Sequence, residues 1–288
     1  MAPEPPDRDG RHADRLMGVG LFTSPVLVAG PCLVEDDDVN LRIADCLAEL
    51  GVRVGVRVVF KASYLKANRA RPDAPRGPGL DGGLAALRRV REVSGLPVLT
   101  DIHETTHAAP AAVVCDILQI PAFLARQTAL IEAAARTGCA LNLKKGQWMA
   151  PEEMAGAVAK AREAGATQVA VTERGTAFGY GDLIVDMRSF GRLRAATKAP
   201  VLFDATHAVQ QPGRGPGGAS GGQREHVPAL MAAAAAAGCD GFFIETHPDP
   251  CRAPSDGNTM WPLDALGALV ERTLHVWQSA RAAEQHHA

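Results

Sequence analysis

The most regular feature of the chain is a series of short, almost uninterrupted apolar runs at fairly even spacing. Strands that are buried on both faces, as in a parallel sheet, produce runs of this kind. We therefore predict eight buried strands. They cover VLVAGPC (26–32), VRVVFKA (56–62), PVLTDIH (97–103), ILQIPAF (117–123), ALNLKKG (140–146), QVAVTER (168–174), PVLFDATH (200–207) and GFFIETH (241–247).

Alanine-rich segments of helical character separate the runs, for example at 41–51, 130–138 and 151–165. Glycine follows several of them, as expected at the carboxyl end of a helix, and Pro151 suits a first helical turn. Eight strand–helix units predict an α/β protein with a (β/α)8 TIM barrel, for which ~250 residues are typical. A doubly wound open sheet is the alternative, but no GxGxxG motif follows the first strand, which weakens that interpretation.

Polar residues end every run, and their placement points to a functional face. In a barrel, the carboxyl ends of the strands converge on the face that carries the chemistry. Charged groups crowded there need partners or ligands. Long loops rich in Gly and Pro follow the second and seventh strands, at 69–79 and 209–222. We interpret them as mobile lids over that face.

Composition narrows the class of protein. The formal net charge of -2 argues against a nucleic-acid or membrane-surface partner, since both require a basic field. Six scattered cysteines without a CxxC pair favour a reducing compartment, so we expect a cytoplasmic protein. The apolar stretch 227–244 is broken by Gly238 and Asp240, which favours a helix followed by a strand over a membrane span.

The N-terminal segment is expected to be a disordered lead-in, because it lacks the apolar core of a signal peptide. The length of the remaining chain suits one large domain. The predicted organisation is a lead-in over 1–20, a barrel domain over 21–282 and a short tail over 283–288.

Potential metal ligands gather at the predicted functional face. The four candidates are Cys32, His207, Glu245 and Asp256. A thiolate, an imidazole and carboxylates together suit one divalent transition metal, such as Fe, Mn, Co or Zn, rather than Mg or Ca. A barrel brings its first, seventh and eighth strands side by side, so separation in sequence is no objection.

Each candidate ligand also has a structural interpretation. Cys32 could fill a small buried space, His207 could donate to a phosphate, Glu245 could pair with a lysine, and Asp256 could cap a turn. His247 is a competing ligand, because strand alternation places it on the same side as Glu245. Asp249 and Cys251 flank a Pro250 turn, where a solvated loop is the more common role.

Cations from several strand ends point to the same face. They are Lys61, Lys66, Arg69, Arg126, Lys144, Lys145 and Arg174. Such a set suggests small anionic substrates, phosphates or carboxylates. Arg126 and Lys145 could instead be surface or helix-start charges. A lysine at a strand end could also form a Schiff base with a carbonyl substrate.

The motifs along the chain resemble those of the 3-deoxy-D-manno-octulosonate 8-phosphate synthases, from the first strand to the last helix. In order, they are AGPC, FKAS, KANR, TDIHE, QIPAFLARQT, KKGQ, ERGTAFGYGDLIVDMRSF, FDATHAVQQPG, ASGG, FIETHPDP and SDG. The resemblance implies a barrel, usually a homotetramer, that condenses phosphoenolpyruvate with arabinose 5-phosphate and forms no imine. Water adds to the second carbon of phosphoenolpyruvate, and phosphate leaves with C–O cleavage.

The same resemblance assigns roles to single residues. Phosphoenolpyruvate would be held by Lys61, Ser63, Gln119, Lys144 and Arg174. The sugar phosphate would be held by Lys66, Asn68 and Arg69, with Arg126 reaching in from a neighbouring subunit. Catalysis would involve Lys61, Lys66, Asn68 and His207. Cys32 after the first strand marks the metal-dependent class, whose ligands would be Cys32, His207, Glu245 and Asp256, with His247 excluded.

The chain departs from the family at the sugar site. It has YLKANRAR where relatives usually have FDKANRSS, so Leu65 replaces an acid and Ala70 replaces a serine. The loss of one hydroxyl donor to a charged group costs on the order of 1 kcal/mol, and the additional cation Arg71 could compensate or suit another sugar. The alternatives are therefore a related synthase that uses another aldose phosphate, a Schiff-base aldolase and a non-catalytic phospholigand-binding barrel.

Overall fold

The structure, a computed structural model, describes residues 20–178 and 180–285. Nearly all of the predicted lead-in and the last three residues of the predicted tail lie outside these ranges.

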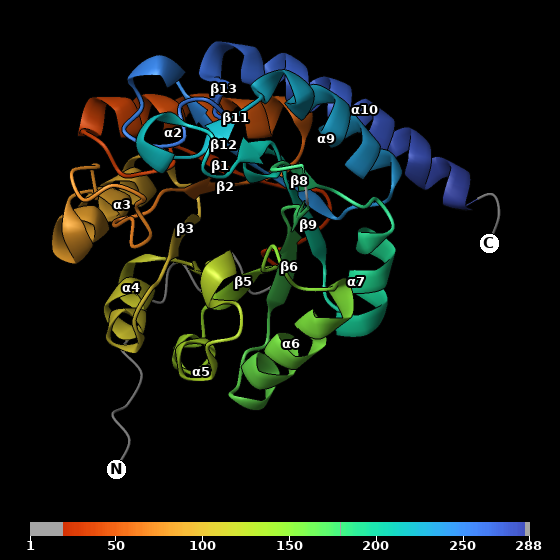
Figure 1. Ribbon diagram of the computed structural model, residues 1–288, viewed down its shortest axis with the longest axis horizontal. Coiled ribbons are helices and arrows are strands. Elements are labelled where there is room, and N and C mark those ends of the chain that lie inside the picture. Colours follow the sequence, from red (N-terminus) through yellow and green to blue (C-terminus); the bar gives the residue numbers. More distant parts are fainter. Residues whose placement is uncertain (1–19, 179, 286–288) are drawn as a thin grey trace.

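Eight parallel strands form a closed barrel (Figure 1). The hydrogen-bonded order runs from β1 through β6 to β9 and β12, and β12 pairs with β1 to close the ring. Closure confirms the (β/α)8 prediction and excludes the open sheet. The barrel strands are β1 (Val26–Gly30), β2 (Arg57–Lys61), β3 (Val98–Asp101), β4 (Ile117–Ile120), β5 (Ala140–Lys144), β6 (Val169–Glu173), β9 (Val201–Asp204) and β12 (Gly241–His247).

Helices surround the barrel, as Figure 1 shows, and helices occur at each of the three segments where the sequence predicts them. They are α2 (Asp37–Val54), α3 (Gly79–Ser94), α4 (Ala108–Val114), α5 (Thr128–Ala135), α6 (Met154–Glu163), α7 (Ser189–Thr197), α8 (Ala205–Ala208), α9 (Val227–Ala236) and α10 (Leu263–Gln285). Among the described residues, no helix combines the length and apolar character that a membrane span requires. The stretch 227–244 forms α9 and the start of β12, as predicted.

Local sequence explains how the helices begin and pack. The side chain of Asp36 accepts a hydrogen bond from Val39 N (2.9 Å) and caps α2, and Gly55 ends this helix in the left-handed conformation with φ 67°. Buried apolar residues at helical spacing face the barrel from α2, including Ile43, Leu47 and Leu50.

Two apolar clusters hold the barrel together. Side chains alternate along a strand, so successive residues pack on opposite faces. In β1, Leu27 and Ala29 belong to the large cluster between strands and helices, whereas Val26 and Val28 belong to a small cluster inside the barrel. The phase of each strand therefore determines which of its residues reach the barrel interior.

Short strands extend the loops at the carboxyl face. Two antiparallel pairs are β7 (Thr176–Ala177) with β8 (Leu183–Ile184), and β10 (Gln210–Gln211) with β11 (Gly221–Gly222). The strand β13 (Trp261–Pro262) continues beside the end of β12. The predicted lid at 209–222 is thus built around a short hairpin.

Candidate active site at the carboxyl ends of the strands

A layer of polar side chains lies directly above the apolar layer inside the barrel. The apolar layer contains Val28, Val59, Leu99, Ile117, Ala140, Ala170, Leu202 and Phe243. Alternation carries the residue two positions further along each strand to the same interior side. Those residues are Gly30, Lys61, Asp101, Gln119, Asn142, Thr172, Asp204 and Glu245.

Gly30 shows how closely the first two strands approach at this level. A Cβ atom at Gly30 would lie 2.2 Å from the carbonyl oxygen of Lys61, so only glycine fits. The chain then continues to Cys32, which is fully buried.

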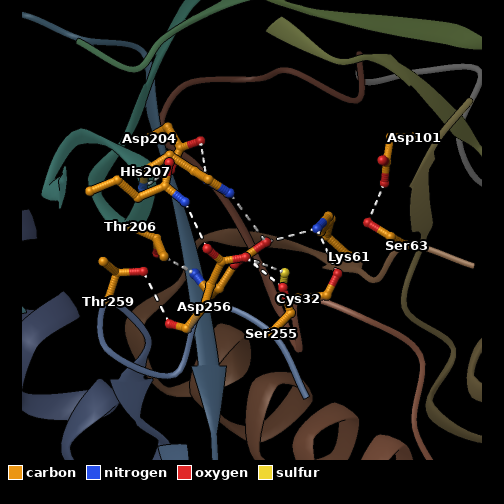
Figure 2. Close-up of polar contacts among 12 residues, drawn as sticks. Cys32, Lys61, Ser63, Asp101, Asp204, Thr206, His207, Ser255, Asp256 and Thr259 are labelled. Carbon is orange, nitrogen blue, oxygen red and sulfur yellow. Dashed lines mark hydrogen bonds and ion pairs between the residues drawn. The ribbon is translucent and has the colours of Figure 1, made fainter. Parts of the chain in front are cut away.

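Three of the four predicted metal ligands form a compact cluster. One donor atom each from Cys32, Glu245 and Asp256 lies within 4.8 Å of the other two. The Cys32 thiol donates to Asp256 Oδ2 (3.0 Å), while the buried Glu245 Oε2 has no hydrogen-bond partner. His207 lies at the edge of this cluster, with Nε2 3.9 Å from Glu245 Oε1. Figure 2 shows Cys32, Asp256 and His207 pointing toward one another.

Asp204 orients the imidazole of His207. Asp204 ends β9, and its Oδ1 accepts from the backbone N–H of His207 (2.9 Å), which caps α8. The other carboxylate oxygen lies 2.8 Å from His207 Nδ1. This contact leaves Nε2 facing the cluster, the arrangement in which a carboxylate orients a metal-binding histidine.

The competing ligands lie elsewhere. His247 Nε2 lies 3.1 Å from Glu35 Oε1, and its Nδ1 accepts from the backbone N–H of Asp249 (2.9 Å). The Asp249 side chain accepts from the backbone N–H of Cys251, as expected for a loop cap. None of the three belongs to the compact donor cluster.

The protonation of the cluster follows from burial and from neighbouring charges. Burial raises the pKa of the Cys32 thiol well above its ordinary value, and the charges of Glu245 and Asp256 raise it further. Burial also opposes ionisation of Glu245, but Lys61 and His207 lower the pKa of this carboxyl below its ordinary value. His207 and Lys66 do the same for the pKa of Asp256. The cluster thus combines a protonated thiol with two ionised carboxylates.

The predicted cations meet around this cluster. Lys61 is buried, and its Nζ donates to Glu245 Oε1 (2.8 Å) and to the carbonyl of Cys32 (3.1 Å). The suggestion that Glu245 pairs with a lysine is therefore correct, although the second carboxylate oxygen stays available. Lys66 Nζ donates to Ser63 Oγ (2.9 Å), whose hydroxyl donates to Asp101 (2.5 Å).

Lys144 occupies an unusual environment. Its ammonium group pairs with Asp204 and lies 3.4 Å from the centre of the Phe243 ring. Burial lowers the pKa of Lys144 to about 8, although the charge of Asp204 opposes the shift. Lys144 is therefore a cation whose charge depends strongly on its neighbours.

Arg174 and Gln119 keep donors available. Arg174 Nη2 donates to Gln210 Oε1 (2.7 Å) and to the carbonyl of His207 (3.2 Å), but its buried Nε has no partner. Gln119 is buried and accepts through Oε1 from Asn142. Both residues can donate to an anion in the interior layer.

The residues predicted for the sugar site lie further out. Arg69 donates to Ser255 Oγ (2.7 Å), and Ser255 in turn donates to Asp256 Oδ2 (2.7 Å). Asn68 is exposed. Arg126 is also largely exposed (70% of its side chain), 3.9 Å from Glu153 and remote from the compact donor cluster.

Lys145 is neither a surface charge nor a helix-start charge. It is fully buried, and its Nζ donates to the carbonyls of Gly146 and Met149 and to Thr176 Oγ1, near Glu173. Alternation explains the difference from Lys144, because adjacent residues of a strand face opposite sides. Lys145 thus supports the loop after β5.

Several polar residues of the site were not among the predicted ones. Asp204, Asn142 and Thr172 belong to the interior layer, and Asp101 pairs with His103 (3.0 Å). A signal was present, because each lies two positions after an interior apolar residue. Reading the strand ends alone missed it.

Comparisons with known proteins agree with this geometry. The model of the DAHP synthetase I family matches residues 15–284. This chain belongs to that family. It is 51% identical over 260 residues to the "2-dehydro-3-deoxyphosphooctonate aldolase" of Alkalilimnicola ehrlichii, covering 90% of this chain and 93% of the relative. Identity to the proteins of the same name is 53% in Nitratidesulfovibrio vulgaris (87% and 91% covered) and 55% in Methylobacterium radiotolerans (86% and 87% covered).

Family membership covers almost the whole barrel. The match reaches from before β1 to the last residues of α10, so it includes every residue of the interior polar layer and of the donor cluster. The resemblance found in the sequence motifs is thereby confirmed.

Proposed function

We propose that the protein condenses phosphoenolpyruvate with D-arabinose 5-phosphate and water, giving 3-deoxy-D-manno-octulosonate 8-phosphate and phosphate. The main structural support is the convergence of Lys61, Lys144 and Arg174 around the cluster of Cys32, Glu245 and Asp256. The printed names of the relatives support the same reaction class.

The reaction needs two anions held close together. A C–C bond forms between the methylene carbon of phosphoenolpyruvate and the aldehyde carbon of the sugar, water adds at C2, and phosphate leaves as the C–O bond breaks. Cations that compensate both substrates reduce their mutual repulsion and favour a reactive orientation. We assign the phosphoenolpyruvate oxygens to Lys61, Ser63, Gln119, Lys144 and Arg174.

Arg174 offers the clearest argument for an anionic ligand. Its buried Nε has no acceptor among the described residues, and an unpaired donor of this kind is costly unless a ligand occupies it. Lys66, Asn68 and Arg69 are assigned to the sugar phosphate, and Lys61, Lys66, Asn68 and His207 to catalysis.

The donor set fits one divalent transition metal. We assign Cys32, His207, Glu245 and Asp256 as its ligands, since they provide thiolate, imidazole and carboxylates, and the buried Glu245 Oε2 lacks another partner. When bound, the metal supplies a Lewis acid or a template that orients a reacting group. The protein itself contributes Asp204, which holds His207, and Lys61, which balances Glu245.

The sugar half leaves room for a second candidate. Leu65 packs against the core, Ala70 is exposed, and the guanidinium of Arg71 lies 3.2 Å from Asp73. Arg71 also lies against Gly217 of the 209–222 loop, where an added Cβ would be 2.7 Å from Arg71 Cδ. Because no hydroxyl is available at position 70, a related synthase that uses another aldose phosphate is the alternative.

We further propose that the chain forms a homotetramer. Exposed aromatic pairs, Phe123 with Trp148 and Phe178 with Tyr180, lie on the loops after β4, β5 and β6. Arg126 follows Phe123 in the same loop, so burial of these rings against a second copy would bring Arg126 near a neighbouring site. Light scattering would test the assembly. We retain a single barrel domain at 21–282 and a cytoplasmic location as proposals.

The deciding experiment follows phosphoenolpyruvate consumption with arabinose 5-phosphate, before and after chelation, with erythrose 4-phosphate alongside. Turnover with the five-carbon sugar that is lost on chelation and restored by a divalent metal supports the proposal. Turnover only with another aldehyde favours the alternative synthase. Absence of turnover in metal-loaded protein contradicts both and leaves a non-catalytic barrel. Borohydride trapping with substrate would detect a Schiff-base aldolase instead.

A further inference from the structure

Three uncharged polar side chains form a hydrogen-bonded chain across β4, β5 and β6 in the interior layer. Thr172 Oγ1 donates to Asn142 Oδ1 (2.6 Å), and Asn142 Nδ2 donates to Gln119 Oε1 (2.9 Å). Thr172 and Asn142 are completely buried, and Gln119 is 4% exposed. Gln119 and Asn142 are also direct partners in the register of β4 with β5.

The hydroxyl of Thr172 gives this chain a direction. Within the described ranges, Asn142 is its hydrogen-bond acceptor, and no other acceptor for it is recorded. If both amides were turned over, Asn142 would donate to the hydroxyl, whose own hydrogen would then be buried without an acceptor. An unsatisfied buried donor is unfavourable, so the arrangement with Thr172 as donor is the stable one.

The direction determines what Gln119 offers to the active site. Its carbonyl oxygen is occupied by Asn142, which leaves the NH2 group as its free hydrogen-bonding function. The neighbouring carboxylate on β3 does not compete for it, because Asp101 accepts from Ser63 and lies 3.0 Å from His103. Gln119 therefore presents a donor, not an acceptor, to the interior of the site.

We propose that Asn142 and Thr172 are positioning residues that hold the amide of Gln119 with its NH2 group toward an anionic oxygen of phosphoenolpyruvate. The inference rests on the proposed function for the identity of the ligand. A turned amide would point its carbonyl at that oxygen and would repel it, so the chain selects the binding-competent orientation.

The test measures phosphoenolpyruvate binding by calorimetry, together with KM and kcat for full turnover. Thr172→Val removes the hydroxyl at nearly constant volume, and Thr172→Ser retains it. We expect Thr172→Val to raise Kd and KM for phosphoenolpyruvate roughly tenfold, as for a lost hydrogen bond to a charged group, with little change in kcat. Thr172→Ser should bind like the wild type.

A double-mutant cycle with Gln119→Leu separates positioning from a general structural effect. Once Gln119 is absent, Thr172→Val should cause no further loss. A similar loss in both backgrounds, or an unchanged Kd in Thr172→Val alone, overturns the inference. Wild-type protein that does not bind phosphoenolpyruvate overturns instead the proposed function on which the inference depends.

A second variant covers the case in which Thr172→Val does not fold. Asn142→Asp accepts from Thr172 and from the Gln119 NH2 group, so it keeps the packing but turns the amide over. We expect a larger loss of binding than the same change causes in the Gln119→Leu background, where only the added charge acts. Equal losses in the two backgrounds contradict the role of Asn142.

Discussion

Metal uptake should expel the proton of Cys32. The thiol donates to Asp256 Oδ2 over 3.0 Å, and burial, with the charges of Glu245 and Asp256, raises the pKa of the Cys32 thiol well above its ordinary value. A metal binds the thiolate, not the thiol. Binding of the proposed metal must therefore release this proton to solvent.

The magnitude follows from the protonation of the three donors. With an ordinary pKa of ~8.5, no more than about 3% of a thiol is ionised at pH 7, and the raised pKa makes the fraction for Cys32 smaller. The pKa values of Glu245 and Asp256 are lowered, so these carboxyls carry no proton to release. We expect close to one proton from Cys32 per metal, and an apparent affinity that rises about tenfold, or 1.4 kcal/mol, per pH unit below the thiol pKa.

Calorimetry of metal-free protein in two buffers of different ionisation enthalpy at pH 7 counts the released protons. The matched control is Cys32→Asn, which cannot release one, and the difference between the two proteins cancels any contribution from His207. With Co²⁺ as the metal, the wild type should also show thiolate-to-metal charge-transfer absorption that the variant lacks. Equal proton counts for both proteins would refute the assignment of Cys32 as a ligand.

Three further predictions concern single residues. Asp204→Asn should weaken metal binding about 10- to 100-fold, because the amide holds His207 Nδ1 less firmly, and unchanged affinity in a metal titration would contradict this. Since the pKa of Lys144 is about 8, its positive charge is lost as pH rises through 8. KM for phosphoenolpyruvate should therefore rise between pH 7 and 9 in the wild type and stay flatter in Lys144→Arg; parallel profiles would exclude this cause. Lys198→Gly should stabilise the fold by about 1 kcal/mol in urea denaturation, because Lys198 ends α7 at φ 52°, a conformation that favours glycine. A destabilised variant would contradict this explanation.

The pattern of the chain predicts much of the fold and the strand-borne part of the site. Continuous apolar runs indicate strands buried on both faces, and alternation then places Lys61, Gln119 and Glu245 inside the barrel. The same rule distinguishes Lys144 from Lys145, although attention to strand ends treats them as neighbours of one kind. Local periodicity suffices here because a strand in a closed barrel has only two sides.

Loop residues need the three-dimensional structure. Asp256 reaches the cluster from the loop after β12, where it adopts φ 52°, and Gly257 fits beneath it because an added Cβ would lie 2.4 Å from the carbonyl of Pro250. No periodicity fixes such a turn. His247, which alternation places beside Glu245, is instead diverted to Glu35, a partner that the sequence pattern does not indicate.

Charge pairing is the property that the sequence conceals most. Lys61 and Glu245 are 184 positions apart, and Lys144 and Asp204 are 60 apart, yet each pair meets inside the barrel. These carboxylates stabilise the charged form of lysines in a layer where burial opposes it. An incoming phosphate or carboxylate therefore meets cations that are already charged and oriented, and Arg174 adds a buried Nε that no protein group occupies. The pairs explain how cations can persist in the barrel interior without substrate, and they make the orientation of those cations a property of the folded protein.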